Sequence, residues 1–403
     1  MITRRVLLQS AAAAVAYSAQ GFRAARAENA PGVTDTEIKI GQTIPYSGPA
    51  SAYGVIGRTE SAYFKMINDQ GGINGRKITF ISLDDAYSPP KTVEQVRRLV
   101  EQEHVAFLAN TLGTAPNAAI RQYLNDNKVP QLFVSSGAPM FADPQHYPWT
   151  IGFIPNYVTE ARIYAKHILA TKPNAKIAVL YQNDDFGKGY LNGLRDVLGP
   201  DRVNTIVKVA SYEVSEPTID SQVVTLQGSG ADVFLIAATP KFAAQAIRKS
   251  YDLDWMATRY LSYVSASIAT VLRPAGLEKS KGLISANFVL DVTDPRWKDT
   301  PDMLAWKAFT DKYMSPTEFV DGNAAAGFGY AATVVQVLKQ CGNDLSRENI
   351  MKQAANLNNF RAPLLWPGIT VNTSPTNYSP IRQSQLTTFN GEHWEPIGDV
   401  MSD

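Results

Sequence analysis

The residue types that most often perform catalysis occur in this chain, but their spacing forms no catalytic or metal-binding set. None of the histidines lies in a His-Glu-x-x-His helix or at another metal-ligand spacing; they are His104, His146, His167 and His393. The chain has no Gly-x-Ser-x-Gly nucleophile turn and no Gly-rich phosphate loop ending in Lys and Ser or Thr. We therefore expect no bound metal, no cofactor and no enzymatic activity.

Two further patterns suggest chemistry but have simpler structural interpretations. Asp84 and Asp85 follow an apolar segment and could act as an acid and a base, but carboxylates at such positions more often cap loops. The run GFGYAA at residues 327–332 matches part of a dinucleotide-binding fingerprint. Because it lies in an Ala-rich helical stretch with no strand before it, close helix packing explains its glycines better.

The composition is that of a globular protein without a nucleic-acid partner. The 403 residues exceed what one hydrophobic core usually covers, so two domains are expected. Hydrophobic residues make up 45% and charged residues 19%, and the formal net charge is +1. Nucleic-acid binding requires a clustered basic surface, which is absent here. The single cysteine, Cys341, excludes an intrachain disulfide, and we interpret its thiol as structural.

The N-terminal residues predict an export signal. Arg4 and Arg5 precede an apolar, Ala-rich run that ends at Ala19, and the small-x-small pattern ARA occupies residues 25–27. The run is shorter than the roughly 20 residues that span a bilayer. We expect residues 1–27 to be a signal peptide of the twin-arginine type, and the mature protein to be periplasmic.

Short apolar runs alternate with segments of helical periodicity in two successive parts of the chain. The first part predicts strands at residues 38–41, 77–83, 105–109 and 131–135, and helices at 55–69, 91–103 and 117–127. The second predicts strands at 176–181, 203–210 and 232–238, and helices at 187–198, 219–226 and 241–251. Such alternation predicts right-handed βαβ units and an α/β fold of two lobes with parallel sheets. Helices at 303–314 and 324–341, and a tail rich in Gly and Pro, do not fit a tandem arrangement.

Parallel sheets of this type bind ligands at the carboxyl ends of their strands. Two such lobes placed face to face form a cleft, and clefts between domains are frequent sites for small molecules. The sequence therefore predicts a small-molecule site between the lobes.

Several motifs resemble those of the branched-chain amino-acid-binding protein family, the type I periplasmic binding proteins. They are KIG at 39–41, YSGP at 46–49, YG at 53–54, NDQGGING at 68–75, DDA at 84–86, IAVL at 177–180, FGKG at 186–189 and ADVF at 231–234. The tail motifs SRENIM at 346–351 and PGI at 367–369 resemble a branch of the family often associated with organic acids. The resemblance runs from about residue 37 to the tail.

The resemblance implies two Rossmann-like lobes joined by three crossover hinge strands. Residues 34–154 and 288–361 would form lobe one, and residues 155–287 and 362–403 would form lobe two. The implied function is that of a monomeric substrate-binding protein that closes on a small solute and delivers it to the membrane permease of an ABC importer.

The positions that match the family's ligand-binding residues come from both lobes. They are Tyr53, Gly113, Thr114, Ser135, Ser136, Gly137, Phe186, Thr239 and Val264. In the run LGTAP at 112–116 a glycine precedes a helix, whose N-terminus favours an anion such as a carboxylate. The run SSG at 135–137 would add hydroxyls and amides to the same anion. Each residue also has a structural interpretation, because the glycines suit turns, Phe186 suits a core and the serines suit a helix cap.

Two departures from the family pattern bear on the solute. The family's cysteine pair in lobe one is replaced by Tyr87 and Leu112, so that bridge is absent. Val264 lies where amino-acid binders carry an acidic residue for the ligand's ammonium group, and a buried ammonium without a counter-charge is costly. We therefore expect a carboxylate without an α-amine, an aromatic or aliphatic acid stacked on Tyr53, Phe186 or Tyr263.

Three alternatives stay open at this point. A Leu, Ile or Val binder would need another carboxylate for the ammonium, such as Glu213 or Asp184. A ligand-sensing subunit of a receptor would have the same sequence features. A hydrolase on this scaffold is disfavoured because no nucleophile and base pair is evident.

Overall fold

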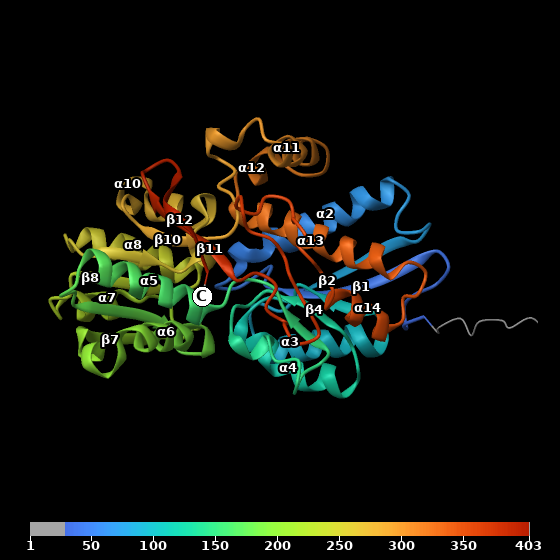
Figure 1. Ribbon diagram of the computed structural model, residues 1–403, viewed down its shortest axis with the longest axis horizontal. Helices are drawn as coiled ribbons and strands as arrows, with labels where there is room; N and C mark the ends of the chain where they lie inside the picture. Colours follow the sequence, from blue (N-terminus) through green and yellow to red (C-terminus); the bar gives the residue numbers. More distant parts are fainter. Residues whose placement is uncertain (1–28, 403) are drawn as a thin grey trace, which may run out of the picture.

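The computed structural model describes residues 29–402 and shows two lobes, each built on a β-sheet covered by helices (Figure 1). The export signal predicted at residues 1–27 lies outside the described residues. Within the described part of the chain, no helix is long and apolar enough to cross a membrane.

The sheet of lobe one has five parallel strands in the order β2-β1-β3-β4-β5. These strands are β1 Glu37–Ile44, β2 Lys77–Asp84, β3 Phe107–Ala109, β4 Gln131–Val134 and β5 Thr150–Gly152. The helices that follow them in the chain are α2 Gly54–Asp69, α3 Pro89–Arg97 and α4 Thr114–Asp126.

Helices from the end of the chain complete this lobe. They are α11 Pro301–Tyr313, α12 Pro316–Phe319, α13 Gly322–Cys341 and α14 Arg347–Ala354. Helix α13 packs against α2 and α14, and α11 also packs against α2; Figure 1 shows these late helices beside the early ones. A Cβ added at Gly327 would lie 2.8 Å from the Ile56 carbonyl oxygen of α2. The close helix packing predicted for that glycine is thus confirmed.

The sheet of lobe two has seven strands in the order β12-β11-β10-β9-β8-β6-β7. They are β6 Ile177–Gln182, β7 Ile206–Tyr212, β8 Val233–Ala237, β9 Thr258–Leu261, β10 Ile284–Asn287, β11 Gln383–Phe389 and β12 Trp394–Ser402. Strands β6 to β10 pair in parallel, whereas the tail adds β11 and β12 in antiparallel orientation. The helices are α5 Tyr157–Thr171, α6 Asp185–Arg202, α7 Asp220–Gln227, α8 Pro240–Asp252, α9 Arg273–Ala275 and α10 Leu277–Ser280.

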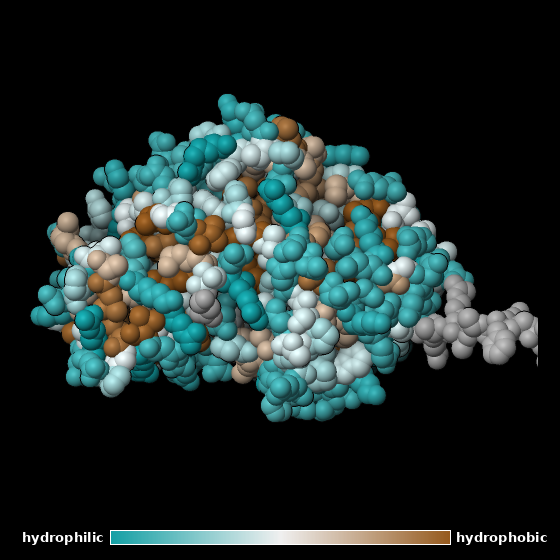
Figure 2. All heavy atoms as spheres, viewed as in Figure 1, coloured by the Kyte–Doolittle hydropathy of each residue, from teal (hydrophilic) through white to brown (hydrophobic). Residues whose placement is uncertain are grey.

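The central strands read as continuous apolar runs because helices cover both faces of each sheet. All residues of β8, VFLIA, are buried, and so are all residues of β4, QLFV. The surface is mostly hydrophilic, and apolar side chains gather where the lobes meet and at the outer side of lobe two (Figure 2).

Two predicted elements begin three residues away from the expected start, whereas the others begin within two residues of it. The helix predicted at 117–127 begins at Thr114, directly after Gly113. The strand predicted at 203–210 begins at Ile206, because Val203–Thr205 form a short 3-10 turn after α6. Asp84 and Asp85 cap the loop after β2, as expected: Asp84 accepts the Tyr46 N–H at 2.9 Å, and Asp85 accepts the Tyr87 N–H at 2.9 Å.

The chain passes between the lobes three times. The first passage joins β5 to α5 at residues 153–156, and the second follows β10 at residues 288–290. Residues 288–290 pair with residues 364–366, where the Leu290 N–H donates to the Leu364 carbonyl and the Trp366 N–H to the Phe288 carbonyl, both at 2.8 Å.

The tail remains on lobe one for some distance before its own passage. The Tyr378 hydroxyl donates to the Pro148 carbonyl at 3.2 Å, and the Leu357 N–H donates to the Thr373 hydroxyl at 2.8 Å. Because β11 begins at Gln383, we propose that the third passage lies near Ile381 rather than at residue 362. The remaining lobe boundaries, at residues 154 and 287, stay predictions.

Candidate functional site

A cavity lies between the lobes at the carboxyl ends of the strands. It encloses about 1000 Å³ of space not filled by atoms, its open mouth included. Six of the predicted site residues line it: Tyr53, Gly113, Ser135, Phe186, Thr239 and Val264. The other three, Thr114, Ser136 and Gly137, are not part of its lining, and they support residues that are. Their binding roles stay predictions.

The N-terminus of α4 forms one end of the cavity. Gly113 precedes this helix with φ 103°, a conformation that L side chains rarely adopt. A Cβ on Gly113 would lie 2.7 Å from the Tyr87 ring. The first backbone N–H groups of the helix, at Thr114 and Ala115, have no acceptor within residues 29–402, as is usual at helix N-termini. This end of the cavity therefore suits an anion.

Neutral hydroxyl groups surround that helix terminus. The Thr114 and Ser136 hydroxyls lie 2.7 Å apart, and both side chains act to lower the pKa of the nearby Tyr157 hydroxyl. Burial raises the pKa of Tyr157 to about 12, so its hydroxyl keeps its proton and stays a donor near neutral pH. Gly137 leaves room for this ring, because a Cβ there would lie 2.8 Å from the Tyr157 side chain. Thr114, Ser136 and Gly137 thus position Tyr157 against the cavity.

Thr239 and Phe186 form the facing wall from lobe two. The Thr239 hydroxyl bonds to Gln182 Oε1 at 3.2 Å and to the Tyr212 hydroxyl at 3.1 Å. The Phe186 ring packs edge-on against Tyr157 at 4.9 Å between centroids.

Val264, predicted from the resemblance to replace the acidic residue of amino-acid binders, lines the cavity with an apolar side chain. Its carbonyl oxygen already accepts the Tyr53 hydroxyl, at 3.1 Å. The carboxylates considered from the sequence as substitutes do not line the cavity. Asp184 caps α6 by accepting the Phe186 N–H at 3.0 Å, and Glu213 is exposed and bonded to the Asn183 amide at 2.6 Å.

One acidic residue that the sequence did not single out, Asp291, does line the cavity. Its Oδ1 accepts the N–H and the hydroxyl of Thr293, at 2.9 and 2.6 Å, and its Oδ2 accepts the Trp394 N–H at 3.0 Å. Asp291 thus holds two segments of the wall together. Among the described residues that line the cavity there is no Lys, Arg or His, so an anion there would depend on hydroxyls and backbone amides.

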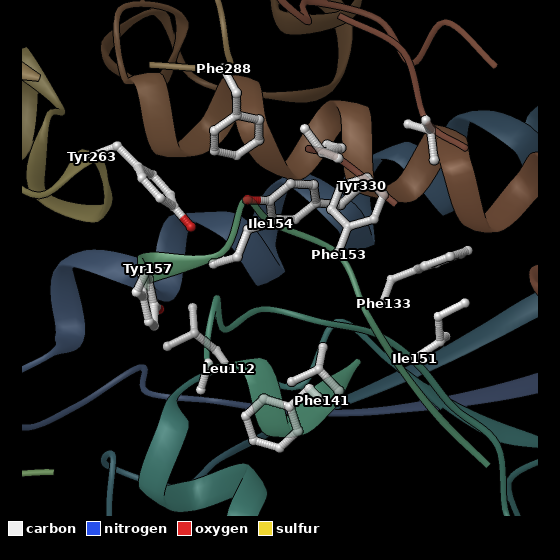
Figure 3. Packing of buried hydrophobic residues seen from close by; sticks show 14 of the residues in the cluster. Leu112, Phe133, Phe141, Ile151, Phe153, Ile154, Tyr157, Tyr263, Phe288 and Tyr330 are labelled. Atoms are coloured by element: carbon white, nitrogen blue, oxygen red, sulfur yellow. The ribbon is translucent and has the colours of Figure 1, made fainter. Parts of the chain in front are cut away.

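Aromatic side chains from both lobes and from the passage at Phe288 form much of the remaining wall. They are Tyr87, Tyr157, Tyr263, Phe288, Tyr330, Trp366 and Trp394. Figure 3 shows Tyr157, Tyr263 and Phe288 following one another along one side, with Leu112 beyond Tyr157. The sequence indicated only Tyr263 and Tyr87 in this set, because the others lie in segments that matched no binding motif.

A buried carboxyl group, that of Glu160, bonds to one residue of this wall. Glu160 of α5 accepts the Tyr263 N–H at 2.9 Å and the hydroxyls of Tyr164 and Tyr190. Burial raises the pKa of Glu160 to about 8, so this group is mostly protonated at neutral pH.

The lobes touch beside the cavity, whose lining includes Ser267 and Asn323. The Ser267 hydroxyl of lobe two donates to Asp321 Oδ1 of lobe one at 2.9 Å, and the Asn323 amide of lobe one donates to the Thr270 hydroxyl at 3.2 Å. Both bonds meet at the N-terminus of α13, where Asp321 also caps the helix by accepting the Asn323 N–H.

The family model described as "Periplasmic binding protein" matches residues 37–392. The chain belongs to this family. It is 24% identical over 323 residues to the "Leu/Ile/Val-binding protein homolog 1" of Brucella abortus, an alignment that covers 77% of this chain and 81% of that protein. The resemblance to the branched-chain amino-acid-binding proteins, inferred from the sequence motifs, is thereby confirmed.

Solved structures of the family share the two-lobed fold. A branched-chain amino acid ABC transporter protein of Thermus thermophilus with bound valine matches with a TM-score of 0.83, at 15% identity, over 92% of this chain and 98% of that one. A fatty acid ABC transporter substrate-binding protein of Thermomonospora curvata matches with a TM-score of 0.77, at 20% identity, over 94% and 95%. The predicted fold class, type I with mostly parallel sheets, is confirmed.

Proposed function

We propose that this protein is the extracytoplasmic substrate-binding subunit of an ABC importer, and that it captures a small carboxylate-bearing solute without an α-amine. The solute's carboxylate is held by the amides at the start of α4 and by the hydroxyls of Ser135 and Tyr157. Closure of the lobes then presents the loaded protein to a membrane permease. The family's relatives described as ABC transporter proteins support the transport role.

One observation carries the choice of solute: the cavity combines a helix N-terminus with Val264 on the facing wall. A free α-amino acid brings an ammonium group together with its carboxylate. Burying that group with no acidic acceptor would cost several kcal/mol. Of the acidic residues within 29–402, only Asp291 lines the cavity, and its oxygens already accept three hydrogen bonds. An acid without the amine avoids this cost.

A Leu, Ile or Val binder is the second candidate, favoured by the names of relatives such as the Brucella protein. In that case the ammonium would have to be held by carbonyl oxygens and tyrosine rings, which can attract cations through their π faces. A receptor's sensing subunit would use the same closure. Loss of uptake of the bound acid in a strain that lacks the protein would separate transport from sensing.

The melting temperature of the mature chain, residues 28–403, against a solute panel tests the proposal. The panel pairs benzoate, phenylacetate and hexanoate with Leu, Ile, Val and Phe at matched concentrations. A solute at 100 times its Kd adds about 2.7 kcal/mol to the free energy of unfolding. We expect the acids to raise the melting temperature and the amino acids to leave it unchanged. The opposite pattern would overturn the solute class and leave the binding-protein role intact.

A further inference from the structure

A group of buried polar side chains lies in lobe one where helix α2 meets the sheet, apart from the solute cavity. Gln42 of β1, Glu60 of α2 and Asn110, directly after β3, are each at most 1% exposed, and none of them lines the cavity. We propose that Glu60 and Asn110 bind one buried water molecule, which completes the hydrogen bonds of both side chains. The site is independent of the proposed function, because it is the same whichever solute the cleft binds.

A chain of hydrogen bonds fixes which atoms of this group donate. The Ser82 hydroxyl donates to Gln42 Oε1 at 2.7 Å, and the Tyr46 hydroxyl lies 2.6 Å from the Ser82 hydroxyl. Because Gln42 Oε1 is an acceptor, Gln42 Nε2 is the donor of that amide. This nitrogen bonds to Glu60 Oε2 and, at 3.3 Å, to the Asn110 carbonyl oxygen. One amide nitrogen thus reaches both residues of the proposed site.

The remaining polar side-chain atoms of Glu60 and Asn110 have no hydrogen-bond partner within residues 29–402. They are Glu60 Oε1 and the Asn110 atoms Oδ1 and Nδ2, and all three are buried. The Asn110 side chain acts to lower the pKa of Glu60, so the two groups are neighbours. Polar atoms buried without a partner are destabilising, and a buried water typically makes about two to four hydrogen bonds to such atoms. Glu60 and Asn110 together supply this set.

The mixture of donors and acceptors favours water over a cation. Burial raises the pKa of Glu60 well above its usual range, which favours the protonated carboxyl group. In that form Oε1 carries the proton, because Oε2 accepts the Gln42 amide, and the proton needs an acceptor. Asn110 presents the donor Nδ2 beside the acceptor Oδ1. Water accepts from one group and donates to another, whereas a cation binds oxygens only and repels the amide hydrogens.

The water would connect α2 to the turn that leads into α4. Asn110 has φ 50°, a left-handed conformation, and lies three residues before Gly113, which precedes α4. The Asn110 N–H donates to the Leu132 carbonyl at 2.9 Å. Gly57 of α2 leaves room for the polar group, because a Cβ there would lie 2.8 Å from Gln42 Oε1. Both sides of the site are therefore held in place by contacts within lobe one.

A high-resolution crystal structure of the mature chain, residues 28–403, tests the site directly. We expect one ordered water within about 2.6–3.2 Å of Glu60 Oε1 and of an Asn110 side-chain atom. Glu160 of lobe two is the control in the same crystal: both its oxygens already accept hydrogen bonds, so we expect no water bound to it. A direct hydrogen bond between Glu60 and Asn110, with no water at either side chain, would overturn the proposal.

Two variants separate water from a cation. Glu60→Gln keeps an acceptor for Gln42 and a donor for the water, so the water and the melting temperature should be retained. Glu60→Leu removes both and should lose the water and lower the melting temperature by about 2–6 °C. Ser61→Leu, at the next and exposed position of α2, is the matched control and should change neither.

Three results would contradict the water site. The first is a melting temperature of Glu60→Leu equal to that of the parent. The second is loss of the bound species in crystals of Glu60→Gln, which keeps the hydrogen bonds but not the ionisable group. The third is a melting temperature of the parent that rises with sodium or potassium chloride but not with choline chloride. The second and third results would identify a cation at Glu60.

Discussion

The hydrogen bond from Ser267 to Asp321 joins the two lobes beside the cavity, so its removal should weaken the binding of every solute that needs closure. The bond is 2.9 Å long, and both residues are less than a tenth exposed, at 7% and 5%. Burial raises the pKa of Asp321, because little water reaches the carboxylate to stabilise its charge. In Ser267→Ala, Asp321 keeps the Asn323 N–H as a donor and loses the one from the other lobe.

The size of the effect follows from what differs between open and closed forms. A hydrogen bond to a charged group contributes about 1.5–3 kcal/mol. The Ser267 hydroxyl also accepts the Thr270 N–H at 3.2 Å, but that bond lies within lobe two and is present in both forms. In the open form, water can bond to Asp321 in place of Ser267, which reduces the difference between the two forms. We therefore expect Ser267→Ala to make the free energy of closure about 1–2 kcal/mol less favourable. This corresponds to a Kd about 5–30 times higher.

The assay is a double-mutant cycle of Ser267→Ala and Asp321→Ala, with Kd measured for the tightest acid of the panel. Asp321 does not line the cavity, so its effect cannot arise from a lost solute contact. We expect the double variant to be no weaker than either single one. Ser280→Ala removes a buried 2.8 Å bond to the Gly276 carbonyl within lobe two and should change stability but not Kd. Additive losses in the cycle, or an unchanged Kd, would refute a bond between the lobes that stabilises closure.

Three further outcomes are expected. Burial raises the pKa of Glu160 from 4.5 to about 8. Between pH 4.5 and about 8 its carboxyl group is therefore protonated in the folded protein and ionised in the unfolded chain. The free energy of unfolding should fall with rising pH in this window, by up to about 1.4 kcal/mol per pH unit. Glu160→Gln should remove that slope in denaturant titrations, and identical slopes would contradict the assignment. Val264→Asp should weaken the acids at least about tenfold by like-charge repulsion and favour Leu over hexanoate in titration calorimetry; unchanged selectivity would argue against its position beside the solute. Gly113→Ala should cost about 1–3 kcal/mol of stability, because a Cβ at φ 103° is strained and meets Tyr87; a variant as stable as the parent in thermal melts would contradict this.

The periodicity of the sequence predicted the first strands and helices of each lobe well, because buried parallel strands are continuous apolar runs and their helices carry one apolar face. The prediction of element bounds was least accurate where the backbone conformation of a single residue, rather than the spacing of apolar residues, decides where an element begins. Helix α4 begins at Thr114, three residues before the predicted start, because the left-handed Gly113 allows the turn. The late strands β11 and β12 lie in the tail, for which the Gly and Pro residues predicted loops and short strands without defined bounds.

The candidate site was predicted only where residues belong to recognisable strand-to-helix turns. Gly113, Ser135 and Thr239 follow strands, so the rule that ligands bind at strand ends places them at the cleft. Phe288, Trp366 and Trp394 follow no such rule, because they come from passages and from the tail. Nothing in their local sequence distinguishes a residue that lines a cavity from one that fills a core.

The sequence by itself determined the α/β class and the family, because both depend on residue type and local spacing. Only the tertiary structure decided which side chains meet across the cleft. Tyr53 reaches Val264 over 211 positions of sequence, and Ser267 reaches Asp321 over 54. Such contacts arise when three passages bring two separately formed sheets together. Their partners are set by packing between lobes, which no local pattern encodes.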